Sequence, residues 1–429
     1  MLASILQFFT KAFKTPEIRK KILITALVLV VYRLAAHIPA AGINRDSLQA
    51  IFAGSPLLSL LDVFSGGTLA NFSIMALGLN PYINASIIMQ LMTYVVPQLE
   101  ELSKEGELGQ EKINQYTRIL TVPLSAFQAF AMYALLRSQQ IIGDLSPLAL
   151  IALIVTMTAG TALAVWLGEL ITEYGISNGV SLLIFVGIVA RLPVVLGQTV
   201  SVFQASDLLR TAVFLGISGT IIALIVIMNE ATRRIPINYA RRSARTANSS
   251  TYLPLRLSQA GVMPIIFAVS LVLLPSFLSQ ILAGSGNPKI AEIAVFLTQN
   301  FNPQSFLYNA FYFILVFSFT YFYTSVVFNP EKLAENLKNN GGYIPGIRPG
   351  KHTQEYLSKV LNRITLVGAS FLGFVAVLPS FFQNFIGFAN LAIGGTGILI
   401  VVSVILEAVR DIESQLVMRR YDAFLTKER

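Results

Sequence analysis

The chain has 429 residues, of which 54% are hydrophobic and only 12% are charged, with a formal net charge of +9. In soluble domains roughly a quarter of the residues are charged. This composition therefore excludes a soluble domain and indicates a polytopic membrane protein. The chain has no cysteine, which excludes disulfides, thiolate metal sites and thiol catalysis. Its two histidines, His37 and His352, lie far apart in the sequence, so we expect no metal site and no cofactor.

The first element in chain order is a cytoplasmic amphipathic segment, residues 1–21. Its apolar residues recur at helical spacing and lysines stand beside them, a pattern typical of a helix lying on an anionic membrane surface. These apolar residues are Leu2, Ile5, Leu6, Phe9 and Phe13. The alternative is a frayed apolar tail.

The next stretch, 56–97, does not resemble a single membrane helix. Residues 56–64 are apolar but too few to span a bilayer, and the glycine pair at 66–67 interrupts any helix. From residue 72 the chain is apolar again as far as Pro97, which is long enough to cross. A short half-helix before a full span is how membrane proteins build irregular backbone that lines a cavity, so the sequence predicts an interior that is hollow or can open.

Apolar runs of membrane-spanning length recur along the chain and predict an all-α protein with ten transmembrane helices. They lie at about 22–36, 72–96, 119–136, 148–171, 179–200, 208–228, 260–282, 306–328, 361–383 and 385–409.

The distribution of Lys and Arg predicts the orientation. Of the 31 Lys and Arg residues, 25 fall on one side of the predicted membrane and six on the other. The six are Arg33, Arg45, Arg137, Arg191, Arg210 and Lys289. Both termini, including the tail 410–429, are therefore expected in the cytoplasm. Ten spans divide into halves of five, 22–200 and 201–409, which enter the membrane in opposite senses. Such an inverted repeat places a functional site where the halves meet.

Two cytoplasmic loops, 229–258 and 329–362, are longer than connections require. The first loop interleaves arginines with Tyr and Ile, and the second holds one arginine in a turn rich in Pro and Gly. The arginines are Arg233, Arg234, Arg241 and Arg242 in the first loop and Arg348 in the second. We interpret both loops as a docking surface for a large polyanionic or acidic partner. The alternative is the positive-inside rule alone, which explains the charge but not the length.

Several motifs spread over the chain resemble those of the SecY family, the channel subunits of the bacterial protein-export translocon. They are Leu77–Ile87, Trp166–Glu169, Gly175–Gly179, Arg233–Ile235, Ala260–Pro264, Ile344–Gly350 and Gly394–Thr396. The resemblance covers essentially the whole length and implies a clamshell of two inverted five-helix halves. It also implies a lateral gate into lipid between the second and third spans and the seventh and eighth.

The resemblance further assigns two sets of residues. The short helix at about 57–67 corresponds to the plug, with Leu57, Leu58, Leu60, Leu61, Asp62, Val63, Phe64, Gly66 and Gly67. The hydrophobic constriction of the pore corresponds to Ile83, Ile87, Val180, Ile184, Ile266 and Ile400.

The spacing and the apolar character of these residues are compatible with a constriction. Ile83 and Ile87 are four apart and share a helix face, and Val180 and Ile184 repeat the spacing. A ring of branched apolar side chains can exclude water and ions and still yield to a bulky chain, although such pairs also occur in ordinary helix packing.

Other polar residues leave alternatives open. Asn80 and Asn84 either line an aqueous funnel or hydrogen-bond to neighbouring helices, and we expect Asp62 to face water. Glu169 and Glu173 lack a nearby nucleophile, so we expect them to pair with basic loop residues or a partner subunit.

Three classes of function can be compared. A protein-conducting channel moves unfolded secretory polypeptides across the membrane and releases transmembrane segments sideways into lipid. A secondary transporter of a small solute fits the inverted repeat equally well, but it needs ionisable residues at the bilayer midplane, and these are almost absent here. An intramembrane enzyme is not expected, because no catalytic pair, HExxH motif or phosphate-binding loop occurs.

The resemblance implies an external driving force, either the SecA ATPase or a translating ribosome with its ribosomal RNA. It also implies the small subunits SecE and SecG, and signal peptides and nascent chains as substrates. The location would be the bacterial cytoplasmic (inner) membrane, in contact with anionic lipids.

Overall fold

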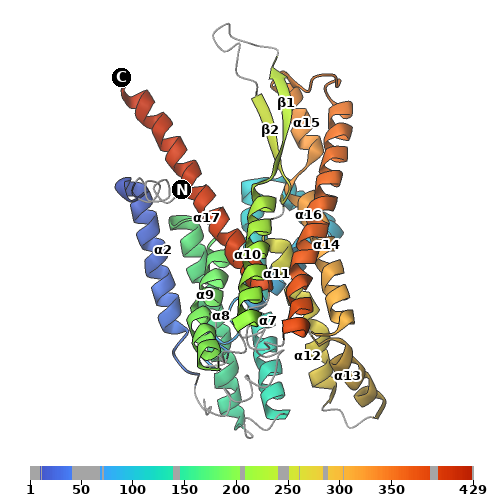
Figure 1. Ribbon diagram of the computed structural model, residues 1–429. Coiled ribbons are helices and arrows are strands. Elements are labelled where there is room, and N and C mark those ends of the chain that lie inside the picture. Colours follow the sequence, from blue (N-terminus) through green and yellow to red (C-terminus); the bar gives the residue numbers. More distant parts are fainter. Residues whose placement is uncertain are drawn as a thin grey trace. The chain divides into compact units, whose positions relative to one another are not determined.

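The computed structural model describes residues 10, 12–40, 68–69, 72–138, 145–202, 208–239, 251–259, 261–283, 288–302, 304–386 and 395–427. This part of the chain is mostly helical, with one small sheet (Figure 1). Contacts divide the chain into two compact units. The first consists of Met1–Phe203, Leu273–Ser305 and Val404–Arg429, and the second of Gln204–Val272 and Phe306–Ser403.

The elements are distributed between the units as follows. The first unit contains α2 (Pro16–Ala35), α5 (Asn80–Val95), α6 (Pro97–Lys104), α7 (Glu107–Ser138), α8 (Pro147–Tyr174), α9 (Gly179–Val202), α12 (Leu274–Ala283) and α13 (Pro288–Asn300). The second contains α10 (Leu208–Glu230), β1 (Thr232–Tyr239), β2 (Thr251–Arg256), α11 (Met263–Val272), α14 (Phe306–Val327), α15 (Pro330–Asn339), β3 (Gly342–Tyr343) and α16 (Lys351–Ile386). The boundary at Ser403 falls inside the last helix, α17 (Gly395–Lys427).

Each of the ten predicted spans overlaps a described helix, although several bounds differ: α2, α7 and α16 begin earlier than predicted and α17 extends to Lys427. Two differences have a clear physical reason. Helix α5 begins at Asn80 and not at 72, because residues 72–79 form turns and Pro81 stands in the first helical turn, where its missing N–H costs little. The span predicted at 260–282 is two helices, with the break at Leu273. Pro275 explains the break, since it donates no hydrogen bond and crowds the preceding turn.

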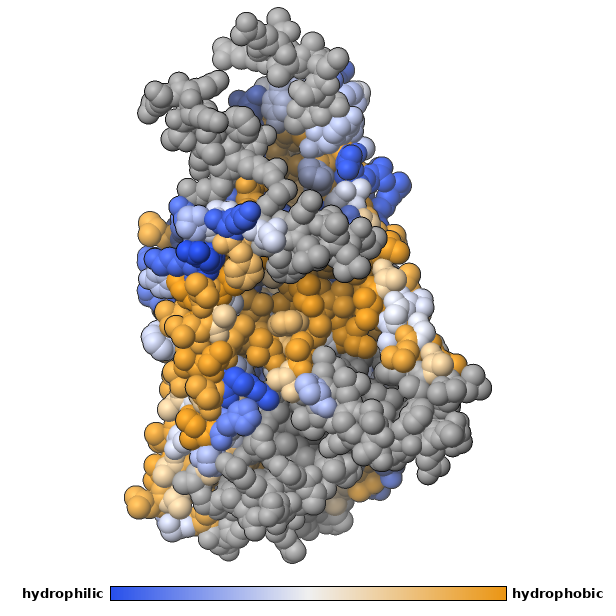
Figure 2. Space-filling model, turned by 60° about the vertical axis from the view of Figure 1, so that its left-hand side comes forward, coloured by the Kyte–Doolittle hydropathy of each residue, from blue (hydrophilic) through white to orange (hydrophobic). Residues whose placement is uncertain are grey.

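Three segments of the described chain are long and apolar enough to cross a membrane: Pro147–Tyr174, Phe306–Asn339 and Lys351–Leu378. Shorter apolar helices add Gly179–Ala190, Leu215–Glu230 and Met263–Val272. Figure 2 shows that apolar residues cover a large part of the visible surface. On α2, for example, Leu23, Leu27 and Leu34 are 58%, 65% and 67% exposed. A soluble protein rarely exposes an apolar patch of this size, so this surface suits contact with lipid.

In the first unit, helix α8 is the element on which several others pack. It contacts α2, α7 and α9, and its glycines allow backbones to approach closely. A Cβ on Gly160 would overlap the carbonyl oxygen of Ile74. The turns at 72–79 therefore rest directly on the backbone of α8, as small residues permit in membrane proteins.

In the second unit, aromatic rings fill the contacts of α14 with its neighbours. Phe267 of α11 lies edge-on to Phe319 and Tyr323, with ring centroids 6.0 and 5.5 Å apart. On the side facing α16, Phe313 meets Phe374 at 5.4 Å. These edge-to-face pairs lock α14 between α11 and α16.

The two long predicted loops contain regular structure that the sequence analysis missed. The first folds into the antiparallel hairpin β1–β2, which extends from the end of α10 (Figure 1). The second supplies α15, the short strand β3 and the first turns of α16. The three strands form one sheet in the order β2-β1-β3.

Candidate functional site

Helices α8 and α9 meet at a tight turn, residues 175–178. A Cβ on Gly179 would overlap the carbonyl oxygen of Gly168, so only glycine permits this approach. Val180 also packs here, with its Cγ2 atom 3.3 Å from the position of a Cβ on Gly168. The start of α9, which carries Val180 and Ile184, is therefore held closely against α8.

Side chains from three helices, α2, α8 and α17, accept hydrogen bonds from the backbone of this turn and of the first residue of α9. The three bonds run from Ile176 N–H to Thr25 Oγ1 (3.1 Å), from Ser177 N–H to Asp411 Oδ2 (2.9 Å) and from Gly179 N–H to Thr172 Oγ1 (2.9 Å). Asn178 then caps α9, because its Oδ1 accepts from the N–H of Ser181 at 3.1 Å. The N–H groups of Gly179 and Ser181, which lack partners within the helix, are thus satisfied by side chains.

The six residues predicted to form the constriction lie on four helices. They are Ile83 and Ile87 on α5, Val180 and Ile184 on α9, Ile266 on α11 and Ile400 on α17. Val180 is half-buried and the other five are buried. On α5 the exposed large apolar residues begin at Ile88, so the two isoleucines belong to its buried first half. Asn80 and Asn84, in the same half, are half-buried.

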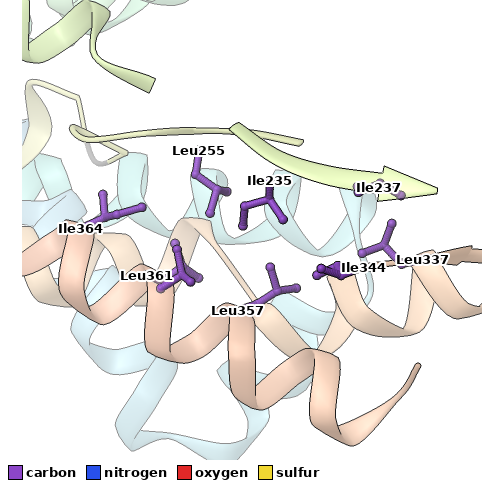
Figure 3. Packing of buried hydrophobic residues seen from close by; sticks show 9 residues of the cluster. Ile235, Ile237, Leu255, Leu337, Ile344, Leu357, Leu361 and Ile364 are labelled. Atoms are coloured by element: carbon purple, nitrogen blue, oxygen red, sulfur yellow. The ribbon is translucent and has the colours of Figure 1, made fainter. Parts of the chain in front are cut away.

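A compact apolar cluster underlies the sheet of the second unit (Figure 3). Ile235, Ile237 and Leu255 point from β1 and β2 toward α16, where Leu357, Leu361 and Ile364 meet them, with Leu337 of α15 and Ile344 beside them. Alternate residues of a strand face the same side, so Arg234 and Pro236 lie on the outer face and are exposed. We call the sheet, α15 and the first turns of α16 the cytoplasmic platform, after the two loops that the sequence predicts to be cytoplasmic.

The arginines predicted to bind a partner are exposed wherever the structure describes them. Arg233 and Arg234 lie on β1. Arg348 lies in a turn between β3 and α16, where Gly346 and Gly350 have φ angles of 81° and 97°, which favour glycine. The hydroxyl of Thr353 donates to the carbonyl oxygen of Arg348 at 2.9 Å, so the backbone that carries this guanidinium is fixed.

Glu169 pairs with a basic residue, as predicted. The Nε atom of Arg118 lies 2.5 Å from Oε1 of Glu169, which joins α7 to α8. Arg118 belongs to α7 and not to an irregular loop, because that helix begins at Glu107. In the part of the chain that the structure describes, no group of His, Asp and Glu could hold a metal ion.

Several predicted features lie outside the described residues. They are the plug residues Leu57, Leu58, Leu60, Leu61, Asp62, Val63, Phe64, Gly66 and Gly67, the arginines Arg241 and Arg242, and residues 1–9 and 11 of the amphipathic segment. Of the five apolar residues on which that prediction depends, Phe13 is the one described, and it is 47% exposed.

The comparisons with known proteins all identify the same family. The family model described as SecY matches residues 73–409. The protein translocase subunit SecY of Streptomyces galbus is 42% identical over 438 residues, which cover 97% of this chain and 99% of the relative. The protein translocase subunit SecY of Mycobacterium bovis is 43% identical over 443 residues, with 98% and 100% covered.

Solved structures share the fold. A SecY structure, described as one whose plug domain stabilises the closed state of the translocation channel, aligns with a TM-score of 0.65 at 20% identity. Sec61 from the canine ribosome-channel complex aligns with a TM-score of 0.58 at 16% identity. Each alignment covers 92% of both chains.

Proposed function

The chain belongs to the SecY family, and we infer from this membership that it forms the protein-conducting channel of a translocase. The observation that carries this conclusion is the match to translocase subunits over essentially the whole length. This is a family of membrane channels and not of enzymes. The alternative, a secondary transporter of a small solute, is not favoured by this membership.

We propose that the constriction of the channel is formed by six apolar residues: Ile83, Ile87, Val180, Ile184, Ile266 and Ile400. The burial of five of them supports this, because residues in contact with lipid would be exposed. Branched apolar side chains hold no water and coordinate no ion, so a narrow ring of them resists ion flow. The same ring offers no fixed polar contacts, so a polypeptide can push it apart.

The resemblance also supports a plug formed by residues 57–67. Its apolar side chains can seal the pore by packing, and Gly66 and Gly67 can provide a hinge. The apolar residues are Leu57, Leu58, Leu60, Leu61, Val63 and Phe64. One structural relative is described as having a plug domain that maintains a membrane seal. We propose the same task for this segment.

The cytoplasmic platform is the proposed docking surface for the driving partner. It presents Arg233, Arg234 and Arg348 on a folded base with its own apolar core, and Arg241 and Arg242 lie in the sequence between β1 and β2. Guanidinium groups bind carboxylates and phosphates through paired hydrogen bonds. The partner would be the SecA ATPase or a ribosome, whose RNA is a polyanion.

The remaining assignments follow from the family. We propose that the protein works in the bacterial cytoplasmic membrane with both termini in the cytoplasm, together with SecE and SecG. The excess of Lys and Arg on the same side supports this orientation and a contact with anionic lipids. Its substrates would be signal peptides and nascent chains.

Reconstitution tests the proposal directly. The chain is purified with its small single-span subunit, placed in liposomes with SecA and ATP, and offered a secretory precursor. Protection of the precursor from added protease is expected, and a precursor with a charge inside its signal sequence serves as the control. If no precursor became protected while a small solute accumulated, the transporter reading would replace the channel.

A further inference from the structure

The carboxylate of Asp411 holds the turn between α8 and α9, although 234 residues separate it from its partner. Its Oδ2 atom accepts the N–H of Ser177 at 2.9 Å and a hydrogen bond from Nε2 of Gln415 at 3.2 Å. Asp411 is half-buried on α17, and a part-buried carboxylate binds a backbone N–H more strongly than a neutral acceptor does. The contact therefore ties the cytoplasmic part of α17 to the point where α9 starts.

The position of this contact makes it more than an ordinary packing hydrogen bond. Ser177 directly precedes Asn178, the residue that caps α9. The start of a helix carries partial positive charge, so an anion beside it is stabilising. The neighbouring N–H groups of Ile176 and Gly179 are taken by threonine hydroxyls of α2 and α8. Asp411 thus contributes the only full charge among the three helical side chains that hold the turn.

The backbone of Ser177 needs such an anchor. Its φ angle is 60°, in the left-handed region that residues other than glycine seldom occupy. Such a conformation persists only where the surroundings enforce it. The hydroxyl of Ser177 is buried and has no hydrogen-bond partner among the described residues, so its side chain adds nothing to the anchoring. The N–H donated to Asp411 is what holds this residue.

The first turns of α9 begin two residues later and carry Val180 and Ile184, two residues of the proposed constriction. We propose that Asp411 is a positioning residue of the channel, which sets where Val180 and Ile184 stand by fixing the turn before them. This inference rests on the proposed function. It assigns a role in closing the channel to a side chain that is not itself one of the six residues of the proposed constriction.

Labelling of a single cysteine tests the proposal without any translocation assay. Because the chain has no cysteine of its own, Val180→Cys provides the only thiol, and its reaction with a polar maleimide reports its exposure. We expect Asp411→Ala to speed this reaction about tenfold, as loss of one hydrogen bond to a charged group allows, and Asp411→Asn to speed it less. Glu413→Ala removes the same charge from an exposed position of α17 and should change nothing.

Two further measurements separate positioning from general loss of packing. A reporter at Ala334→Cys, buried in the cytoplasmic platform, should react at the same rate in every variant. Ser177→Gly removes the backbone strain, so it should restore slow labelling at position 180 in the Asp411→Ala background. Faster labelling at both reporters, no rescue by Ser177→Gly, or equal effects of Asp411→Ala and Glu413→Ala would each overturn the proposal.

Ion conductance in planar bilayers gives the functional consequence. The resting channel with Asp411→Ala is expected to leak more than the wild type, and Ser177→Gly in the same chain should reduce the leak. The wild-type protease-protection assay is run in parallel. If the wild type moved no precursor, the proposed function would fail, while the labelling rates would still decide whether Asp411 positions the start of α9.

Discussion

Gly168 and Gly179 touch backbone to backbone where α8 turns into α9, because a Cβ on Gly179 would overlap the carbonyl oxygen of Gly168. The contact is possible only because residue 179 has no side chain, and it brings Val180 against α8. The packing of two glycines therefore decides where the first residues of α9 stand.

Gly179→Ala should accordingly destabilise the protein. Forcing a methyl group against a backbone carbonyl typically costs ~1–3 kcal/mol, and here both helices would have to separate. Thermal unfolding in detergent, followed by tryptophan fluorescence of the single Trp166, measures the change. Gly219→Ala in α10 is the matched control, since nothing lies within 4 Å of its Cβ position. An equal loss of stability in both variants would contradict the explanation.

The ion pair between Arg118 and Glu169 should contribute little to stability. Their side chains are 52% and 30% exposed, and exposed pairs are typically worth about 0.2–1 kcal/mol. We expect Arg118→Glu to lower the unfolding temperature slightly and the exchanged pair, Arg118→Glu with Glu169→Arg, to restore it. Lys112→Glu reverses a charge at an exposed position of the same helix and serves as the control. A loss of several kcal/mol, not recovered by the exchange, would mean that the pair has another task.

Hydropathy predicted the helices because a membrane span needs a long apolar run, whatever the rest of the fold does. It placed the start of α5 too early, since the apolar turns at 72–79 and the helix itself look alike in composition. The strands were missed although Ile235 and Ile237 alternate with polar or proline neighbours, as do Leu253 and Leu255. Prolines inside both runs argue against strands, and we interpreted the stretch only as a long basic loop that docks a partner.

The contact between Asp411 and Ser177 had no signal in the sequence. Both residues lie in stretches that looked like a connection and a cytoplasmic tail, and 234 positions separate them. No local period or spacing predicts such a pair, because it depends on how helices far apart in the chain pack together. The residues of the proposed constriction, in turn, came from the family resemblance and not from their pattern.

Polar substitution in the proposed constriction should favour the open channel. Ile266 and Ile400 are 5% and 0% exposed, and burying an amide without a partner costs ~1–3 kcal/mol. The closed state would bear that cost, so Ile266→Asn and Ile400→Asn are expected to raise ion conductance and to accept precursors with defective signal sequences. Ile405→Asn, at a position of α17 that is 45% exposed, is the control. Stricter selection of signal sequences by either variant would rule this mechanism out.

The last prediction concerns Arg348 and the driving partner. The other arginines proposed to bind the partner occur as neighbours in sequence, Arg233 with Arg234 and Arg241 with Arg242, so the loss of one leaves another close by. Arg348 stands alone in its turn, and the Thr353 hydroxyl and the glycines around it fix its backbone. A charge-assisted hydrogen bond of this kind contributes ~1.5–3 kcal/mol, roughly ten- to a hundredfold in binding.

We therefore expect Arg348→Glu to abolish driven translocation and Arg348→Lys to impair it, because lysine lacks the planar fork of arginine. Arg242→Ala should have a smaller effect than either. Lys338→Glu, which reverses an exposed charge on α15 of the same platform, controls for charge alone. Translocation into liposomes is measured alongside binding of SecA and of ribosomes, each scored separately. Because the Arg348 side chain is exposed and outside the apolar cluster, the unfolding temperature should not change. Normal translocation with Arg348→Glu would remove this residue from partner binding and leave only the shape of the platform to explain docking.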